Sequence, residues 1–291
     1  MSRLNDLIAS IHSSLHSFTG VQEQVTYLTA ACDANQTILP VGSSEHLQRG
    51  IAEIEDELIY VDSVDSSGLI LPPFGRGFRG SVAAAHPINS VVTYDPPFPR
   101  KDIRSAIDSC VEGLFPSLYQ VKSTTIQYDP SKVGFALPAD CEGVLDVMEE
   151  APSSVNYWHR LGRWAYDPTS GITGSKALSI FEEVRPWANL KVTYRAKFGA
   201  FVSGTDTLPS VGLSESYADL ILYGVTARLI RFLDPSRLQL RAVENLSRAG
   251  VVAVGDAGKV ANQLYAMYQQ RLTEERTRLL ALTPPSINFT R

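Results

Sequence analysis

Three of the four residues at positions 96–99 are prolines, and this short segment divides the chain into two kinds of pattern. Proline lacks a backbone N–H and fixes φ, so the segment can continue neither a β-ladder nor the interior of a helix. Strand-like alternation comes before it, and helical periodicity begins again at Ile103. The segment therefore predicts a stiff connector and a domain boundary.

The part before the connector begins with one helix and continues with short strands. Apolar residues recur at helical spacing from Leu4 to Phe18, which predicts an amphipathic helix over residues 3–18 that ends at Gly20. Residues 65–68 (DSSG) are typical of a turn. We expect residues 1–20 to form an N-terminal helix and residues 21–95 a separate small β-barrel or β-sandwich domain. The strand-like runs are residues 25–31, 37–41, 58–64, 69–71 and 91–94.

The part after the connector combines helices with further strands. Ser214 is expected to cap a long helix that Asp234 and Pro235 end. The expected fold class is α+β: a helical bundle with long C-terminal helices at residues 96–282, an inserted antiparallel β-region at about 120–200, and an extended C-terminal tail at 283–291. Helices are predicted at residues 103–115, 214–233, 237–247 and 257–282, and strands at 124–128, 143–148, 178–184 and 190–196.

Residues 76–86, RGFRGSVAAAH, form the most distinctive local motif. Gly75, Gly77 and Gly80 have the spacing of a dinucleotide fingerprint, but Pro87 and the strand-like run 91–94 leave no room for the helix that this fingerprint requires. The motif instead predicts a β-domain turn in which glycines permit φ > 0. The turn residues singled out are Arg76, Gly77, Arg79 and Gly80, and we expect Arg76 or Arg79 to pair with a carboxylate of a neighbouring chain.

The same motif resembles the RG-x-x-GT-x-A-A-x-H signature of small β-domains in tailed-phage structural proteins, with Ser81 in place of the usual threonine. The order of elements is similar to that of head-to-tail connector (adaptor) proteins, which form a portal-binding neck ring. The matching pieces are the segment 137–144, the strand-like run 192–196, and the two long helices with their proline-containing tail. The chain departs from the smallest connectors by its extra β-domain at 21–95.

This resemblance implies a non-enzymatic virion structural protein of a bacteriophage. It would form a homo-oligomeric ring of about twelve copies, a dodecamer, that joins the portal protein to the next neck or tail protein and continues the DNA channel. Its location would be the head-tail neck of the virion, after synthesis in the host cytoplasm. Another tail or baseplate component is the alternative, and a carbohydrate-binding module is an alternative from a different class.

Charge and cysteine content fit these expectations. The net charge of −5 per chain becomes about −60 in a dodecamer, so an acidic lumen would let double-stranded DNA slide without sequence specificity. The start of the chain lacks a signal-peptide pattern, and no window reaches the roughly 18 apolar residues of a membrane span, so we expect no membrane partner. Cys32, Cys110 and Cys141 are predicted to be buried, reduced thiols.

No set of residues with the spacing of a catalytic or cofactor site is evident. His12 and His16 lie four apart on the first helix, but no Glu or Cys completes a metal site, and both fall beside serines on the expected outer face. Residues 255–259 (GDAGK) have Ala253 where a phosphate loop needs glycine and Val260 where it needs Ser or Thr, so they predict a helix N-terminus instead. The other histidines, His46, His86 and His159, are scattered. We therefore expect no catalytic residue, cofactor or metal.

Two clusters in the middle of the chain have both a functional and a structural interpretation. The acidic cluster suits glycosidase chemistry, but solvent-facing charges at strand ends are the preferred interpretation. The aromatic cluster suits a sugar platform, but core or subunit packing is preferred. The acids are Asp140, Glu142, Asp146, Glu149 and Glu150, and the aromatics are Tyr157, Trp158, Trp164, Tyr166 and Trp187.

Two binding surfaces are predicted for the assembled ring. The helix at 214–233 is apolar over much of its circumference, and we expect Leu220, Gly224, Ala227 and Arg228 to form the ring interface. The tail cannot be helical at its paired prolines and is expected to bind the portal as an extended strand. The portal-binding tail residues are Pro284, Pro285, Ile287, Phe289 and Arg291.

Overall fold

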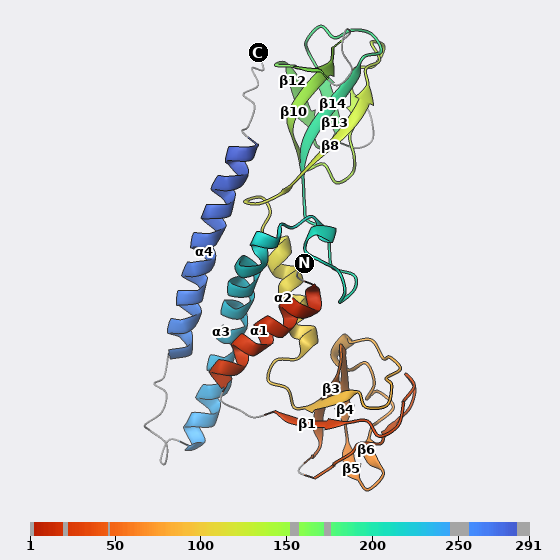
Figure 1. Ribbon diagram of the computed structural model, residues 1–291, viewed down its shortest axis with the longest axis vertical. Coiled ribbons are helices and arrows are strands. Elements are labelled where there is room, and N and C mark those ends of the chain that lie inside the picture. The colour runs from red at the N-terminus through yellow and green to blue at the C-terminus, as the bar shows by residue number, and fades with distance from the viewer. Residues whose placement is uncertain are drawn as a thin grey trace. The chain divides into compact units, whose positions relative to one another are not determined.

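The computed structural model describes residues 3–19, 23–45, 47–151, 157–171, 176–244 and 256–283, without the side chains of 17–19, 232–244, 256 and 257. Over these residues the fold is α+β, with four α-helices and four antiparallel sheets (Figure 1). Contacts divide the chain into two compact units. We call Ser2–Cys110 with Ala218–Tyr268 the N-terminal unit, and Val111–Tyr217 with Gln269–Arg291 the middle unit.

Two helices of the N-terminal unit bury an apolar stripe along one face. Helix α1 (Leu4–Thr19) buries Leu4, Ile8 and Ile11, which confirms the predicted N-terminal helix, and it packs on α3 (Figure 1). Helix α2 (Arg100–Glu112) buries Ile103 and Ile107. Helix α3 spans Ala218–Glu244 and α4 spans Asp256–Leu282, where the sequence predicted 257–282.

Helix α3 corrects two sequence predictions. It continues through Asp234 and Pro235, which were expected to end it, so residues 237–244 belong to it rather than to a separate helix. Proline has a helix-compatible φ and removes only one backbone donor, so a long helix can tolerate it. Ser214 does not cap α3 directly. It precedes a 3-10 turn (Glu215–Tyr217), and its Oγ accepts a hydrogen bond from Ser216 N at 3.3 Å.

The strands of the N-terminal unit form two open sheets around one core. The first has the order β1-β7-β3-β4 and the second β2-β6-β5. The described strands therefore form no closed barrel, which was one of the two forms that the sequence predicted. The strands are β1 (Gln24–Tyr27), β2 (Ile38–Leu39), β3 (Gly50–Ile54), β4 (Glu57–Val61), β5 (Ser63–Asp65), β6 (Gly68–Ile70) and β7 (Val91–Tyr94). Both sheets contribute to the core, which includes Leu39, Ile54, Ile59, Leu69 and Val92.

The predicted turn at residues 65–68 is confirmed, because Asp65 pairs with Gly68 between β5 and β6. Gly68 has a φ of 124°, and a Cβ there would lie 2.1 Å from the carbonyl oxygen of Leu39. The predicted strand 58–64 is instead two strands, because the chain leaves the first sheet at Asp62 and enters the second. Strand β3 was not predicted.

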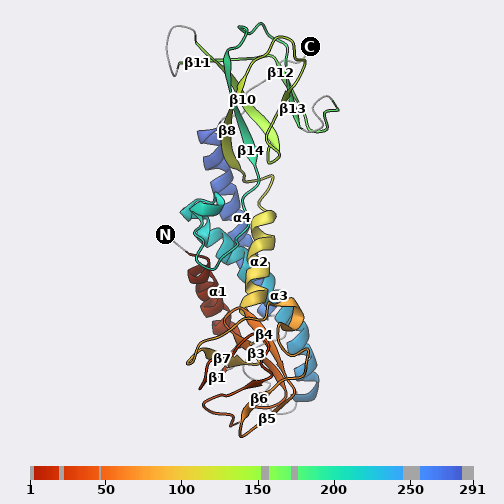
Figure 2. The ribbon, with the colours of Figure 1, turned by 90° about the vertical axis from the view of Figure 1, so that its right-hand side faces the viewer.

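The middle unit holds the two other sheets, with orders β11-β10-β14-β8 and β12-β13-β9 (Figure 2). Their strands are β8 (Gln120–Gln127), β9 (Phe135–Ala136), β10 (Gly143–Glu150), β11 (Trp158–Arg160), β12 (Trp164–Asp167), β13 (Ala177–Ile180) and β14 (Asn189–Ala196). Four of them match predicted runs. Val147, Leu178, Leu190 and Val192 are fully buried between the sheets. No helix in the described part of the chain is long and apolar enough to cross a membrane.

Candidate functional site

The turn motif is organised by a buried carboxylate, that of Glu57 at the start of β4. Arg76 donates from Nε to Glu57 Oε1 and from Nη2 to Oε2, each at 2.8 Å. The backbone N–H groups of Gly77 and Ala84 donate to the same carboxylate at 3.0 and 3.1 Å, and His86 Nε2 lies 2.9 Å from Oε2. The exposed fractions of the Glu57 and Arg76 side chains are 1% and 7%. Five groups thus converge on one carboxylate inside the N-terminal unit.

The Arg76 guanidinium also donates to three backbone carbonyls, those of Asp33, Gln36 and Ala84. The expectation that Arg76 pairs with a neighbouring chain is therefore wrong. Its partner is Glu57 of its own chain, because a buried guanidinium needs a full set of acceptors close at hand. Arg79 is exposed, with its guanidinium 5.8 Å from the Phe78 ring, so an intersubunit role stays a prediction for Arg79 alone.

Glu57 explains why the glycine spacing does not indicate a nucleotide site. The backbone turns through Gly77 (φ 61°), Arg79 (φ 51°) and Gly80 (φ 74°), and such turns direct N–H groups toward an anion. Here the anion is the carboxylate of Glu57. Burial disfavours its charge, but the hydrogen bonds from Arg76, Ala84, His86 and Gly77 outweigh this and lower the pKa of Glu57 to about 2.

Substitution of Gly80 tests the turn geometry. Valine at Gly80 should cost about 1–2 kcal/mol, because a β-branched residue is strained at φ 74°. Arg79→Ala keeps a residue of similar backbone preference and should leave the unfolding midpoint unchanged while weakening self-association. Urea unfolding and sedimentation velocity measure the two effects. A Gly80→Val protein as stable as the wild type would contradict this account of the turn.

An exposed apolar surface lies on the outer face of the β1–β7 strand pair, and we call it the β1–β7 face. Tyr27 pairs directly with Val91 and Val25 with Thr93, so these four side chains share one side, while Thr26 and Val92 point into the core. Val25, Tyr27 and Val91 are 60%, 50% and 57% exposed. Strand β1 is also the edge of its sheet. Its outer edge is partly covered, because Gly42 N donates to the Tyr27 carbonyl at 2.9 Å, but the exposed apolar face itself is typical of a protein-binding surface.

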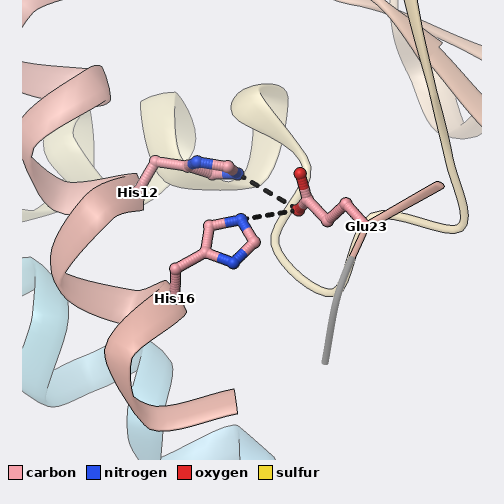
Figure 3. A group of neighbouring side chains, drawn as sticks. All are labelled: His12, His16 and Glu23. Carbon is pink, nitrogen blue, oxygen red and sulfur yellow. Dashed lines mark ion pairs between the residues drawn. The ribbon is translucent and has the colours of Figure 1, made fainter. Parts of the chain in front are cut away.

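Three side chains that could hold a metal ion meet beside α1 (Figure 3). His12 and His16 are joined by Glu23, whose Oε1 lies 3.4 Å from His12 Nε2 and 2.9 Å from His16 Nε2. The sequence prediction that no Glu completes this pair is wrong, because Glu23 lies beside the two histidines in the structure. All three residues are partly buried rather than on an outer face. Burial lowers the pKa of His12; Glu23 opposes this shift, and His16 and Arg100 add to it.

The four residues predicted for the ring interface lie on α3, and three of them pack within the chain. Leu220 and Ala227 are buried, and Gly224 lies against Tyr268 and Cys110. Arg228 is exposed, so ring contact through this face rests on Arg228 and stays a prediction. The portal-binding tail residues, like His46, lie outside the described residues.

The acidic cluster is formed of ion pairs within the middle unit. Asp146 pairs with Arg160 at 3.0 Å and is buried, not solvent-facing as expected. The remaining pairs are Asp140–Lys122, Glu142–Lys176 and Glu149–Arg185, while Glu150 accepts from Asn189. An open pocket of about 630 Å³ includes Glu149, Tyr157 and His159 in its lining. Of the aromatic cluster, Trp164 is buried, whereas Tyr157 and Trp187 are exposed.

The thiols are free, with Cys32 and Cys141 buried and Cys110 only partly buried, which corrects the expectation for Cys110. Burial nevertheless raises the pKa of Cys110 to about 11, so its reactive thiolate form is suppressed at neutral pH.

Comparison with protein-family models and with curated proteins gave no match to this chain.

Proposed function

We propose that the protein is a virion structural component, a ring-forming connector that joins a phage portal to the tail and continues the DNA channel. The observation that carries the proposal is the β1–β7 face, where Val25, Tyr27 and Val91 are exposed together at a sheet edge. The occupant we propose is a second copy of the chain, because a ring needs each subunit to present such a surface to the next. The motif at residues 76–86 supports the same assignment by resemblance.

Several other exposed apolar side chains support a protein with more than one partner. In the N-terminal unit, Tyr265 and Met267 of α4 are exposed, and in the middle unit Phe181, Trp187 and Val202 are exposed. A neck ring contacts its neighbours laterally and two further proteins axially, so it needs more than one such surface. In the proposed assembly the net charge of −5 per chain keeps the channel from binding DNA tightly.

The proposal is tested by the mass of the purified protein, alone and with its portal. Negative-stain electron microscopy and mass photometry should show closed rings or portal-bound rings for the wild type. Tyr27→Arg should reduce ring formation at least tenfold, because it places a charge in the apolar contact. Val133→Arg is the matched control: Val133 is also an exposed apolar residue, but it lies in the middle unit.

A protein that stays monomeric at high concentration and with the portal present would contradict the connector function. Binding of an oligosaccharide by that monomer would instead favour the carbohydrate-binding alternative, for which the pocket with Tyr157 is the place to look. Rings that form equally well with Tyr27→Arg would leave the connector function standing and would remove the β1–β7 face from the contact.

A further inference from the structure

The cluster of His12, His16 and Glu23 combines residues from two elements into a compact group of donor atoms. The histidines are one helical turn apart on α1, and Glu23 directly precedes β1 (Figure 3). One ligand atom from each residue lies within 4.8 Å of the others. The two imidazole rings are 4.5 Å apart between centroids and inclined at 72°, so they approach the carboxylate from different directions.

The distances match those between the ligands of a tetrahedral metal ion. Zinc bound at about 2.0–2.1 Å by nitrogen and oxygen places its ligand atoms about 3.3 Å from one another. The distances from Glu23 Oε1 to the two Nε2 atoms, 3.4 and 2.9 Å, bracket this value. Glu23 Oε1 is buried and accepts no hydrogen bond of good geometry, although both nitrogens are near. The two nitrogens and the oxygen thus have the spacing of ligands around one ion.

The helix positions its two ligands before any ion binds. Leu4, Ile8, Ile11 and Leu15 are buried, so packing fixes the rotation of α1 and with it the side from which His12 and His16 project. A ligand pair at i and i+4 on a rigid helix needs little rearrangement, which favours binding. The charge of Arg100 disfavours a nearby cation, but its guanidinium donates hydrogen bonds to Asn5 Oδ1 at 3.1 Å and to Asp56 Oδ1 at 3.4 Å.

We propose that His12, His16 and Glu23 bind a divalent transition-metal ion, with zinc the preferred ion. Two imidazoles and one carboxylate are ligands that zinc accepts, and three protein ligands leave a fourth position for water. The ion would connect the N-terminal helix to the strand that begins the first sheet, and its ligands His16 and Glu23 are 7 positions apart in the sequence. The proposed site does not depend on the connector function.

The test is titration of the chelator-treated full chain with zinc chloride in a calorimeter, together with the visible spectrum after addition of cobalt. The wild type should bind one ion per chain, and cobalt should give the intense absorption of a tetrahedral site. His12→Ala and His16→Ala should each weaken zinc binding by more than about 100-fold, beyond the cost of losing an outer-shell partner. Glu23→Gln should do the same while preserving side-chain shape.

His159→Ala is the matched control, because His159 is exposed and lies in the middle unit, outside the cluster. It should bind zinc as the wild type does. Absence of saturable zinc binding in the wild type would overturn the proposal, and so would equal binding by the wild type and Glu23→Gln. Far-UV circular dichroism identifies a variant that has lost its fold. If the histidine variants do not fold, the cobalt spectrum of the wild type alone shows whether a tetrahedral metal site exists.

Discussion

Replacing Glu57 by alanine is expected to destabilise the N-terminal unit by about 3–5 kcal/mol, the cost of breaking a buried ion pair by removing one partner. The loss is large because the side chains of Arg76 and His86, which are 7% and 1% exposed, would lose the carboxylate that they contact. Arg76 is left as a buried charge, and the N–H groups of Gly77 and Ala84 lose their acceptor. Since Arg76 also bonds the carbonyls of Asp33 and Gln36, the loop that contains them should loosen with it.

Urea unfolding followed by circular dichroism measures this effect, and peptide-resolved hydrogen exchange locates it. Tryptophan fluorescence is unsuitable, because all three tryptophans lie in the middle unit. Glu55→Ala is the matched control. Glu55 also lies near His86, at 3.5 Å, but its side chain is 67% exposed, so its loss should change stability by less than about 1 kcal/mol. Equal losses in the two variants would refute the central role of Glu57.

The same carboxylate should make the protein sensitive to acid. The pKa of Glu57 is about 2 in the folded chain, below its ordinary value of 4.5, so its stabilisation is complete above pH 4.5 and is lost as the pH falls toward 2. The loss should approach roughly 3 kcal/mol, and Glu57→Gln should lack this part of the pH profile. Burial raises the pKa of Glu53 to about 7, so that residue acts in the opposite sense, between pH 4.5 and 7.

The sequence predicted those elements whose apolar spacing alone decides their structure. Helix α1 and helix α4 fall within two residues of their expected limits, because a glycine follows α1 in the sequence and paired prolines follow α4. Strand β3 was missed because its apolar residues are interrupted by Glu53, a residue type that is rarely buried. Its carboxylate is accommodated by a hydrogen bond from Arg100 N, a contact across 47 positions that no local pattern contains.

The candidate sites were predicted less well, because each depends on a partner from another element. The motif at residues 76–86 was recognisable, but Glu57, which organises it, lies 19 positions before Arg76 in a run that reads only as a strand. The His12 and His16 pair was likewise visible in the sequence. Glu23 joins it only through the tertiary structure, and the i, i+4 histidine spacing was the signal that could have prompted a search for a third ligand.

Gly224→Leu is expected to destabilise the packing of α3 by about 3 kcal/mol, at the upper end of overpacking costs. A Cβ at Gly224 would lie 2.9 Å from Tyr268 Cδ2 of α4 and 3.0 Å from Cys110 Sγ of α2, so the glycine lets three helices approach closely. Burial, with a smaller contribution from Cys110, raises the pKa of Tyr268 to about 12. The leucine side chain would have to displace both neighbours.

Two further variants separate overpacking from helix propensity. Gly224→Ala gains about 1 kcal/mol of helix propensity but makes the same Cβ contacts, so its stability should stay near that of the wild type. Gly162→Leu is the matched control, because nothing lies within 4 Å of a Cβ built there, and it should be nearly neutral. Urea unfolding ranks the three variants by stability, and electron microscopy shows whether Gly224→Leu still assembles into rings.

Gly224 packs inside its own chain. We therefore expect Gly224→Leu to impair ring formation only as far as it disrupts the packing of the helices. A Gly224→Leu protein that is fully stable yet monomeric would instead place Gly224 in the contact between subunits.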